Sequence, residues 1–350
     1  MRIIVNDIAA SNGGALTILK YFYNLAQSDK GRAHTWIFLV SDEYIRESEN
    51  VSVIKLSVVK KNHLNRLFFD FISGGKYIEE LKPDIVISLQ NTIIRHINVP
   101  QILYVQQSIP FQEVKKFSFF KKEELNYAIY QYIIGYFIKA SIKKASYTIV
   151  QTKWMKDAVI KQLGVDSDKV MIMLPDVQNS LICKLKPLNS NLFFYPTSDA
   201  LYKNISVFDK ATEYLKATEK ADVLSIVTVD ASFKYKNLHC VGNMPIKDVF
   251  EMYSRSTLVF SSYIETVGLP LIEARNIGAL ILASDCPFSR EVLNEYENAY
   301  FFSPFNYIEL AKLMSDVMTG KIVRKVVDGN DSYKDNTNYL AFYDMLELFD

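Results

Sequence analysis

The chain has 350 residues, of which 49% are hydrophobic and 23% charged, and this composition excludes a globally disordered protein. Lys and Arg number 40 and Asp and Glu 39, so the net charge of +1 argues against a dedicated nucleic-acid binder. At ~150 residues per domain, the length predicts two domains.

The first half of the chain carries short apolar runs rich in β-branched residues, which predict strands. Six such runs lie at residues 2–7, 36–42, 51–57, 84–90, 101–107 and 147–152. Helical patterns alternate with them at residues 15–27, 64–81 and 154–163. Strands that alternate with helices indicate a parallel sheet covered on both faces.

The second half repeats this design, and the sequence therefore predicts an α/β protein with two doubly wound domains. Its strands are expected at 192–197, 223–229, 238–243, 257–262, 280–285 and 300–304, and its helices at 205–216, 246–254, 269–276 and 307–318. We assign the domains to residues 1–172 and 191–335, with a Pro-containing linker at 173–190. A last helix within 336–350 is expected to pack back on the first domain.

Cysteine usage and hydropathy set the expected compartment. Cys183, Cys240 and Cys286 lie far apart and show neither a disulfide framework nor a zinc spacing, which favours a reducing compartment. The first residues, MRIIVND, are typical of a strand rather than a signal peptide, and the most apolar stretch, 127–140, is too short to cross ~30 Å of hydrocarbon. These features predict a cytoplasmic protein, with peripheral attachment to the inner face of the cytoplasmic membrane as an alternative.

The most specific pattern lies within residues 261–285, SSYIETVGLPLIEARNIGALILASD. Seven residues separate Glu265 from Glu273 across a turn from a strand into a helix. The free N–H groups and the positive dipole end of such a helix can hold a diphosphate. At ~1.5 Å per residue, Glu273 lies one to two turns into the helix, within reach of a ribose diol. The backbone that would face the diphosphate belongs to Thr266, Val267, Gly268 and Leu269.

This Glu-x7-Glu pattern, together with the later Arg290-Glu291-Val292, resembles the retaining glycosyltransferases of family 4, also called glycosyltransferase group 1. The resemblance covers most of the chain and is strongest from 147 to 305. It implies a GT-B fold, in which two Rossmann-like domains face each other across a cleft. It also implies that Glu265 contacts the donor sugar and Glu273 the ribose. The alternative interpretation is a solvated helix with two surface acids.

Two further segments of the second domain fit the same resemblance. Residues 194–206, FYPTSDALYKNIS, resemble the loop in which a Lys of the family grips the diphosphate, and this role falls on Lys203. The Arg that relatives usually carry a few residues earlier is missing here, and a surface lysine is the alternative. Residues 241–262 resemble the segment that holds the nucleotide base through its main chain, near Asn243 and Met244, whereas Tyr253 is expected to pack.

In the first domain, residues 12–17, NGGALT, resemble the family's glycine loop after the first strand. Without side chains, Gly13 and Gly14 let the backbone approach a phosphate or sugar, although a simple turn explains the pair equally well. Residues 88–111 resemble a subset of the family that has a His lining the donor sugar, and Gln106 stands at that position. A Gln donates and accepts hydrogen bonds but does not titrate. Asn91 and Gln107 are expected to face the cleft as well.

Two remaining signals have competing interpretations. Asp166-Ser167-Asp168 has the D-x-D form of metal-dependent transferases, but a capped turn is favoured. The four histidines show no metal spacing, so we expect neither a metal nor a cofactor. Residues 115–144 mix Lys pairs with aromatic residues and predict either a face for an anionic membrane or a pair of helices packed into the first domain.

The sequence thus predicts a retaining hexosyltransferase that moves a sugar from a nucleotide-diphosphate sugar to a glycan or polyprenyl-diphosphate-linked acceptor. Bacterial surface polysaccharide synthesis, of O-antigen, capsule or lipopolysaccharide, is the expected setting by analogy. The predicted catalytic residues are Glu265, Lys203 and Gln106. Two alternatives are a nucleotide-sugar epimerase on the same fold and a non-catalytic subunit that binds a nucleotide sugar.

Overall fold

The computed structural model describes residues 1–10, 13–60, 65, 68–174, 183–219, 221–232, 234–326 and 339–349. The chain divides into two compact units. The first unit comprises residues 1–111, 126–176 and 335–350, and the second comprises residues 112–125 and 177–334. Four predicted segments lie partly outside the described residues: the glycine loop at residue 12, the helix at 64–81 at residues 64, 66 and 67, the linker at 175–182, and the last helix at 336–338 and 350.

The first unit is built on a seven-stranded sheet with the strand order β3-β2-β1-β4-β5-β6-β7. Its strands are β1 (Arg2–Asp7), β2 (Thr35–Val40), β3 (Val51–Lys55), β4 (Ile85–Ser88), β5 (Gln101–Val105), β6 (Tyr147–Val150) and β7 (Val170–Ile172). Every neighbouring pair is parallel. The central strands consist of apolar residues that are buried on both faces, as expected for a parallel sheet with helices on each side.

Helices cover both faces of this sheet. They are α1 (Gly13–Gln27), η1 (Gly31–Ala33), α2 (Ser57–Lys60), the π-helical turn η2 (Phe69–Ser73), α4 (Gly74–Glu80), α5 (Leu125–Ala128), the π-helical turn η3 (Ile129–Ile134), α6 (Gly135–Lys144), α7 (Lys153–Leu163), η4 (Ser167–Lys169) and α13 (Tyr339–Glu347). On one face, α1 and α13 pack over β1, β4 and β5. On the other, η2 and α4 pack over β1 and β4, and α6 and α7 over β5 and β6.

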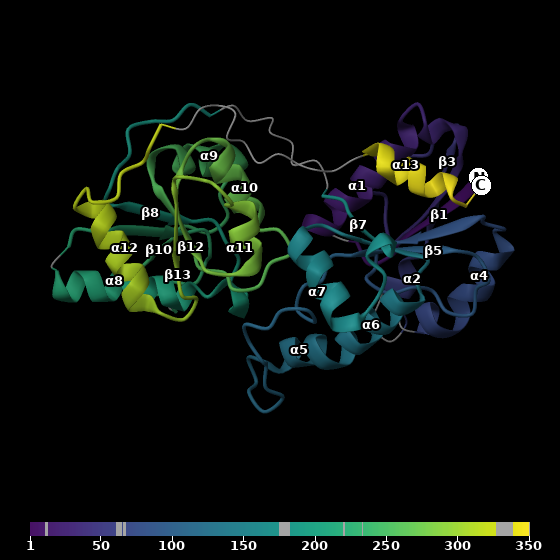
Figure 1. The fold of residues 1–350 in the computed structure, drawn as a ribbon, viewed down its shortest axis with the longest axis horizontal. Helices are drawn as coiled ribbons and strands as arrows, with labels where there is room; N and C mark the ends of the chain where they lie inside the picture. The colour runs from purple at the N-terminus through teal and green to yellow at the C-terminus, as the bar shows by residue number, and fades with distance from the viewer. Residues whose placement is uncertain are drawn as a thin grey trace. The chain divides into compact units, whose positions relative to one another are not determined.

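The last helix, α13, is part of the core of the first unit (Figure 1). The Phe342 ring meets the Phe22 ring of α1 edge to face, with the ring centroids 5.6 Å apart. The Tyr343 hydroxyl donates a hydrogen bond to the Leu25 carbonyl oxygen at 2.7 Å. The chain therefore closes on its first sheet after completing the second.

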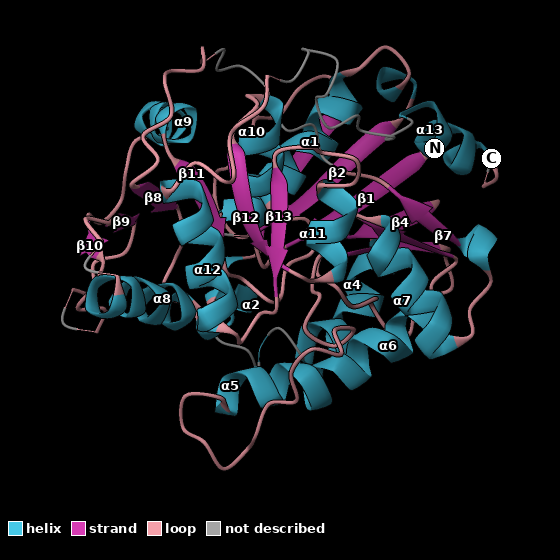
Figure 2. Ribbon diagram, turned by 60° about the vertical axis from the view of Figure 1, so that its left-hand side comes forward, coloured by secondary structure: helices cyan, strands magenta, loops and turns pink. Residues whose placement is uncertain are grey.

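The second unit contains a six-stranded parallel sheet with the order β10-β9-β8-β11-β12-β13. Its strands are β8 (Leu192–Tyr195), β9 (Leu224–Val227), β10 (His239–Cys240), β11 (Thr257–Phe260), β12 (Leu280–Ser284) and β13 (Ala299–Phe302). Its helices are η5 (Leu201–Lys203), α8 (Ile205–Thr218), α9 (Ile246–Arg255), α10 (Leu269–Asn276), α11 (Pro287–Val292) and α12 (Tyr307–Met318), and Figure 2 shows them around the strands.

Each of the twelve predicted apolar runs contains a strand, and the predicted α/β class with two parallel sheets is confirmed. The predicted helix at 64–81 is different in kind, because its described central part is the π-helical turn η2, which continues into α4. The sequence analysis did not predict the short elements α2, β7 and α11, whereas α6 lies in the segment for which a pair of helices was one of the two interpretations.

Among the described residues, no helix is both long and apolar enough to cross a membrane.

Candidate functional site

The order of strands in the second sheet selects the place where a ligand can bind. From β8 the chain moves outward to β9 and β10, and it then returns to β11 on the other side of β8. The loops that follow β8 and β11 therefore leave the sheet in opposite directions, which opens a crevice at the carboxyl ends of these two strands. This place, where the strand order reverses, is the switch point of the sheet. These loops, residues 196–204 and 261–268, contain Lys203 and Glu265.

Lys203 and Glu265 form an ion pair at this switch point. The Lys203 Nζ lies 2.5 Å from the Glu265 Oε1, and only 18% and 16% of the two side chains are exposed. The Ser262 hydroxyl donates a second hydrogen bond to the same oxygen at 2.8 Å. Burial by itself lowers the pKa of Lys203, but Glu265 and Tyr195 together outweigh it, so the pKa lies above its ordinary value of 10.5. Lys203 is therefore a fixed positive charge at neutral pH.

Hydroxyl groups beneath the pair fix the backbone of the Lys203 loop. The Tyr195 hydroxyl donates to the Lys203 carbonyl oxygen at 3.2 Å, and the Ser261 hydroxyl donates to the same oxygen at 2.9 Å. Burial raises the pKa of Tyr195 to about 12, so this hydroxyl keeps its proton at neutral pH. The Tyr263 N–H donates to the Tyr202 carbonyl oxygen at 3.0 Å and joins the two loops directly. The ammonium group of Lys203 is thus presented from a rigid support.

The turn before α10 has the backbone of a helix start with no side-chain cap. Gly268 has a φ of +84° and occupies the N-cap position, where a Cβ would lie 3.3 Å from the Leu271 Cδ1. Val267 is buried and Thr266 half-buried, whereas Leu269 is exposed. Because the Val267 side chain points into the protein, this residue can offer a ligand only its backbone. The turn fits an anion through its N–H groups.

Glu273 lies on α10 and is held by a buried tyrosine. The Tyr253 hydroxyl, on α9, donates to the Glu273 Oε2 at 2.9 Å. Burial raises the pKa of Glu273 above its ordinary 4.5, and the hydrogen bond from Tyr253 opposes this only in part. Tyr253 is fully buried, and its ring packs edge to face on Phe194 with a centroid distance of 5.9 Å. Tyr253 therefore packs as expected, and it also orients Glu273, which the sequence did not indicate.

The two residues assigned to the nucleotide base follow β10. Asn243 is exposed and Met244 half-buried, ahead of α9. In the sheet, β9 separates β10 from β8. The structure therefore places this pair at the same sheet edge as Lys203, farther from the switch point.

In the first unit, the corresponding switch point lies between β1 and β4. Gly13 and Gly14 begin α1, just beyond β1. Gln106 follows β5, and its Nε2 donates to the Leu89 carbonyl oxygen at 3.2 Å. The Asn91 Oδ1 accepts from the N–H groups of both Gln106 and Gln107, at 2.6 and 2.9 Å. Asn91 thus holds the Gln106 backbone at the carboxyl end of the first sheet.

The Asp166-Ser167-Asp168 sequence forms a capped turn. The Asp166 Oδ1 accepts a hydrogen bond from the Asp168 N–H at 3.0 Å and caps the short helix η4. In the described ranges, no group of three or more His, Cys, Asp or Glu side chains is arranged to hold a metal ion.

Comparisons with known proteins agree with this arrangement. Residues 183–331 match the family of glycosyl transferases, group 1. The O-antigen chain mannosyltransferase RfbU of Salmonella typhimurium is 26% identical over 169 residues, which are 45% of this chain and 47% of that protein. The chain thus aligns with about half the length of this curated relative.

Solved structures extend the similarity to the whole chain. Sucrose-phosphate synthase from Thermosynechococcus elongatus is 14% identical, with a TM-score of 0.69 over 99% of this chain and 98% of that one. Anabaena Alr3699/HepE in complex with UDP is 13% identical, with a TM-score of 0.62 over 99% and 100% of the chains. The protein has an α/β GT-B fold, and its second unit contains the part that matches the glycosyl transferase family.

The hydrogen bond from Tyr253 to Glu273 leads to a prediction for the pKa of Glu273. Tyr253→Phe removes the hydrogen bond that lowers the Glu273 pKa, so this pKa should rise further above 4.5. Carbon-13 NMR titration of the Glu273 carboxyl measures the change. Tyr296→Phe is the matched control, because the Tyr296 hydroxyl is also buried but donates to the Ala279 carbonyl oxygen. An unchanged Glu273 pKa in Tyr253→Phe would contradict the contact.

The raised pKa of Glu273 also determines how the free energy of unfolding depends on pH. The folded protein holds the Glu273 proton more tightly than the unfolded chain, because burial raises the pKa in the folded state. The contribution of this carboxyl to the free energy of unfolding is therefore fully present below the unfolded pKa and is lost as pH rises through the folded pKa. Because Tyr253→Phe should raise the folded-state pKa of Glu273 further, the loss of this contribution should occur at higher pH in the variant.

Proposed function

We propose that the protein is a retaining glycosyltransferase of family 4 that transfers a hexose from a nucleotide-diphosphate sugar. The observation that supports this most strongly is the shielded Lys203–Glu265 pair beside the uncapped start of α10. A lysine and a row of backbone N–H groups neutralise a diphosphate without a metal ion. The match of residues 183–331 to the glycosyl transferases supports the same function.

In this proposal each polar group has one task. Lys203 and the N–H groups of residues 266–269 bind the diphosphate, and they stabilise the charge that builds on it as the sugar departs. Glu265 accepts hydrogen bonds from the sugar, and Glu273 accepts them from the ribose, while the base lies against the backbone of Asn243 and Met244. The acceptor hydroxyl attacks the sugar on the face from which the diphosphate departs, and a diphosphate oxygen takes the proton of that hydroxyl. Attack on this face retains the anomeric configuration.

We place the donor sugar also against Gly13, Gly14 and Gln106, and the acceptor against the first unit. A glycan or a polyprenyl-diphosphate-linked glycan of bacterial surface polysaccharide synthesis is the proposed acceptor. The O-antigen mannosyltransferase RfbU, which aligns with part of the chain, supports that setting. HepE, whose structure contains UDP, supports a nucleotide donor.

A peripheral contact with the cytoplasmic face of the membrane would bring the enzyme to such an acceptor. The described part of the segment at 115–144 packs partly into the core, through Ile138 and Ile142. Its outer face nevertheless leaves Ile133 and Tyr136 50% and 68% exposed, close in sequence to the exposed Lys143 and Lys144. Apolar and aromatic groups flanked by lysines suit the interface of an anionic bilayer.

The test of the function begins with a thermal-shift screen of UDP-, GDP- and dTDP-sugars. A donor at 100 times its Kd should add about 2.7 kcal/mol to the free energy of unfolding. With the best donor, transfer should continue in EDTA, and proton NMR of the product should show the anomeric configuration of the donor. Binding without transfer or hydrolysis would instead identify a non-catalytic subunit, and activity that EDTA abolishes and Mg²⁺ restores would refute the metal-free mechanism.

The two glutamates should separate nucleotide binding from sugar transfer. Glu273→Ala should weaken binding of the free nucleoside diphosphate, because a lost charged hydrogen bond costs roughly 1.5–3 kcal/mol. Glu265→Gln keeps an amide oxygen that can accept from Lys203, and it should spare that affinity and reduce transfer. Calorimetry with the diphosphate on both variants decides the matter, and an equal loss in both would overturn this division of roles.

Gln106 should act on the sugar and not on the nucleotide. Gln106→Ala should lower kcat/KM by leaving sugar hydroxyls unpaired, with little change in the affinity for the nucleoside diphosphate. Gln106→His should keep activity, because His can form similar hydrogen bonds. Gln162→Ala is the matched control, since Gln162 lies near the end of α7 and its Nε2 donates to the Phe111 carbonyl oxygen at 2.8 Å. Initial rates that do not change in Gln106→Ala would place this residue outside the sugar site.

A further inference from the structure

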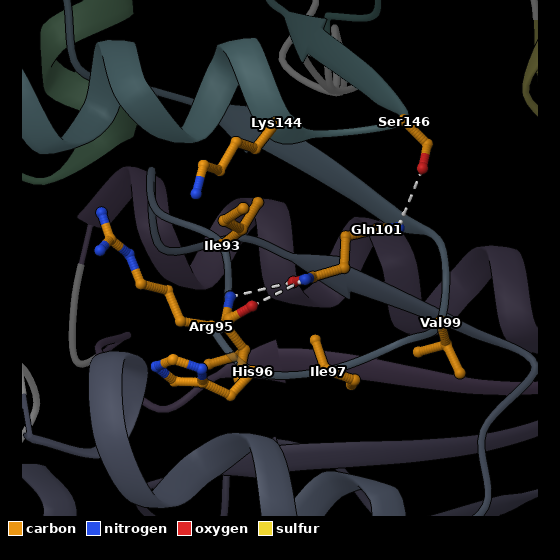
Figure 3. A pocket seen from close by; sticks show the side chains of 9 residues that line it. Ile93, Arg95, His96, Ile97, Val99, Gln101, Lys144 and Ser146 are labelled. Atoms are coloured by element: carbon orange, nitrogen blue, oxygen red, sulfur yellow. Dashed lines mark hydrogen bonds between the residues drawn. The ribbon is translucent and has the colours of Figure 1, made fainter.

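A second polar pocket lies in the first unit, at the amino-terminal edge of its sheet. It has a volume of about 420 Å³ and lies between the loop that joins β4 to β5 and the end of α6. Gln101, the first residue of β5, and Ser146, just before β6, belong to its wall (Figure 3). Gln106 and Gly14 lie at the opposite, carboxyl-terminal edge of the same sheet, so this pocket is separate from the residues assigned above.

The loop that forms one wall is held rigidly. The buried Gln101 side chain donates to the Ile94 carbonyl oxygen at 2.7 Å and accepts from the Ile94 N–H at 2.9 Å, as Figure 3 shows. On the other side, α4 approaches the loop at Gly75, where a Cβ would lie 2.4 Å from the Arg95 carbonyl oxygen. The backbone at Arg95 and His96 is therefore fixed before any ligand arrives.

Three basic side chains converge on this pocket. Figure 3 shows the polar ends of Arg95, His96 and Lys144 on the same side of it. The Arg95 guanidinium lies over the Phe71 ring, 4.6 Å from its centroid, and this contact attracts it to the ring face. Within the described part of the chain, none of the three side chains forms a hydrogen bond or an ion pair, and no described acidic residue lines the pocket. The rest of the wall is mainly aliphatic.

We propose that this pocket binds a phosphate group carried on an apolar moiety. The planar fork of Arg95 can bind two phosphate oxygens at once, and Lys144 adds a second permanent positive charge that matches a phosphate dianion. A ring N–H of His96 supplies a further donor, whereas Ser146 lies on the opposite side of the pocket (Figure 3). The aliphatic wall receives the apolar part. The phosphate can come from a soluble alkyl phosphate or from a lipid headgroup, and the experiment distinguishes these sources.

The soluble arm uses calorimetry with hexyl phosphate and inorganic phosphate on the full chain. Hexyl phosphate should bind more tightly than inorganic phosphate. Arg95→Gln and Lys144→Gln should each weaken hexyl phosphate binding about tenfold or more, as expected for the loss of a charge-assisted hydrogen bond. Lys76→Gln should leave it unchanged, because Lys76 is exposed on α4 but does not line the pocket.

The lipid arm measures co-sedimentation of the same variants with phosphatidic acid–phosphatidylcholine vesicles. A loss in Arg95→Gln and Lys144→Gln, but not in Lys76→Gln, identifies a lipid phosphate as the ligand, whereas specific effects on hexyl phosphate alone identify a soluble one. No binding in either arm, or equal losses in all three variants, would overturn the proposal. The affinity for a nucleoside diphosphate should stay at the wild-type value in every variant, which separates this test from that of the proposed function.

Discussion

The ion pair between Lys203 and Glu265 is the interaction on which the candidate site depends. Both side chains are more than four-fifths shielded, so removing either partner would leave a largely desolvated charge without compensation. The pair joins the loop after β8 to the loop after β11, and serine and tyrosine hydroxyls fix both loops from below. A diphosphate that binds here does not have to order the lysine, because the fold has already done so.

The parallel topology explains why these groups meet. Lys203 and Glu265 are 62 residues apart in the chain, yet β8 and β11 are neighbours in the sheet, and their carboxyl ends lie at the same edge. Gly268 then turns the second loop into α10, whose N-terminus lies at that edge and which carries Glu273 one turn further. One switch point therefore provides a cation, a helix dipole and two carboxylates with different surroundings.

Much of this architecture could be predicted from the sequence, because apolar runs and turn residues have strong local signals. The Glu-x7-Glu pattern with its glycine correctly indicated the strand, turn and helix around 257–276. The three-residue β7 and the six-residue α11 are too short to show a period. The Tyr253–Glu273 hydrogen bond and the Ser262 contact with Glu265 depend on tertiary packing, which no local pattern contains.

The most direct test of the central claim exchanges the two charges. The double variant Lys203→Glu/Glu265→Lys keeps an ion pair between the two loops but moves the cation off the β8 loop. Calorimetry with the nucleoside diphosphate that the wild type binds best, on protein shown by thermal melting to be folded, measures the effect. Our account predicts that the double variant melts cooperatively and binds the diphosphate at least about tenfold more weakly. Wild-type affinity in the exchanged protein would contradict the assignment of Lys203 to the diphosphate.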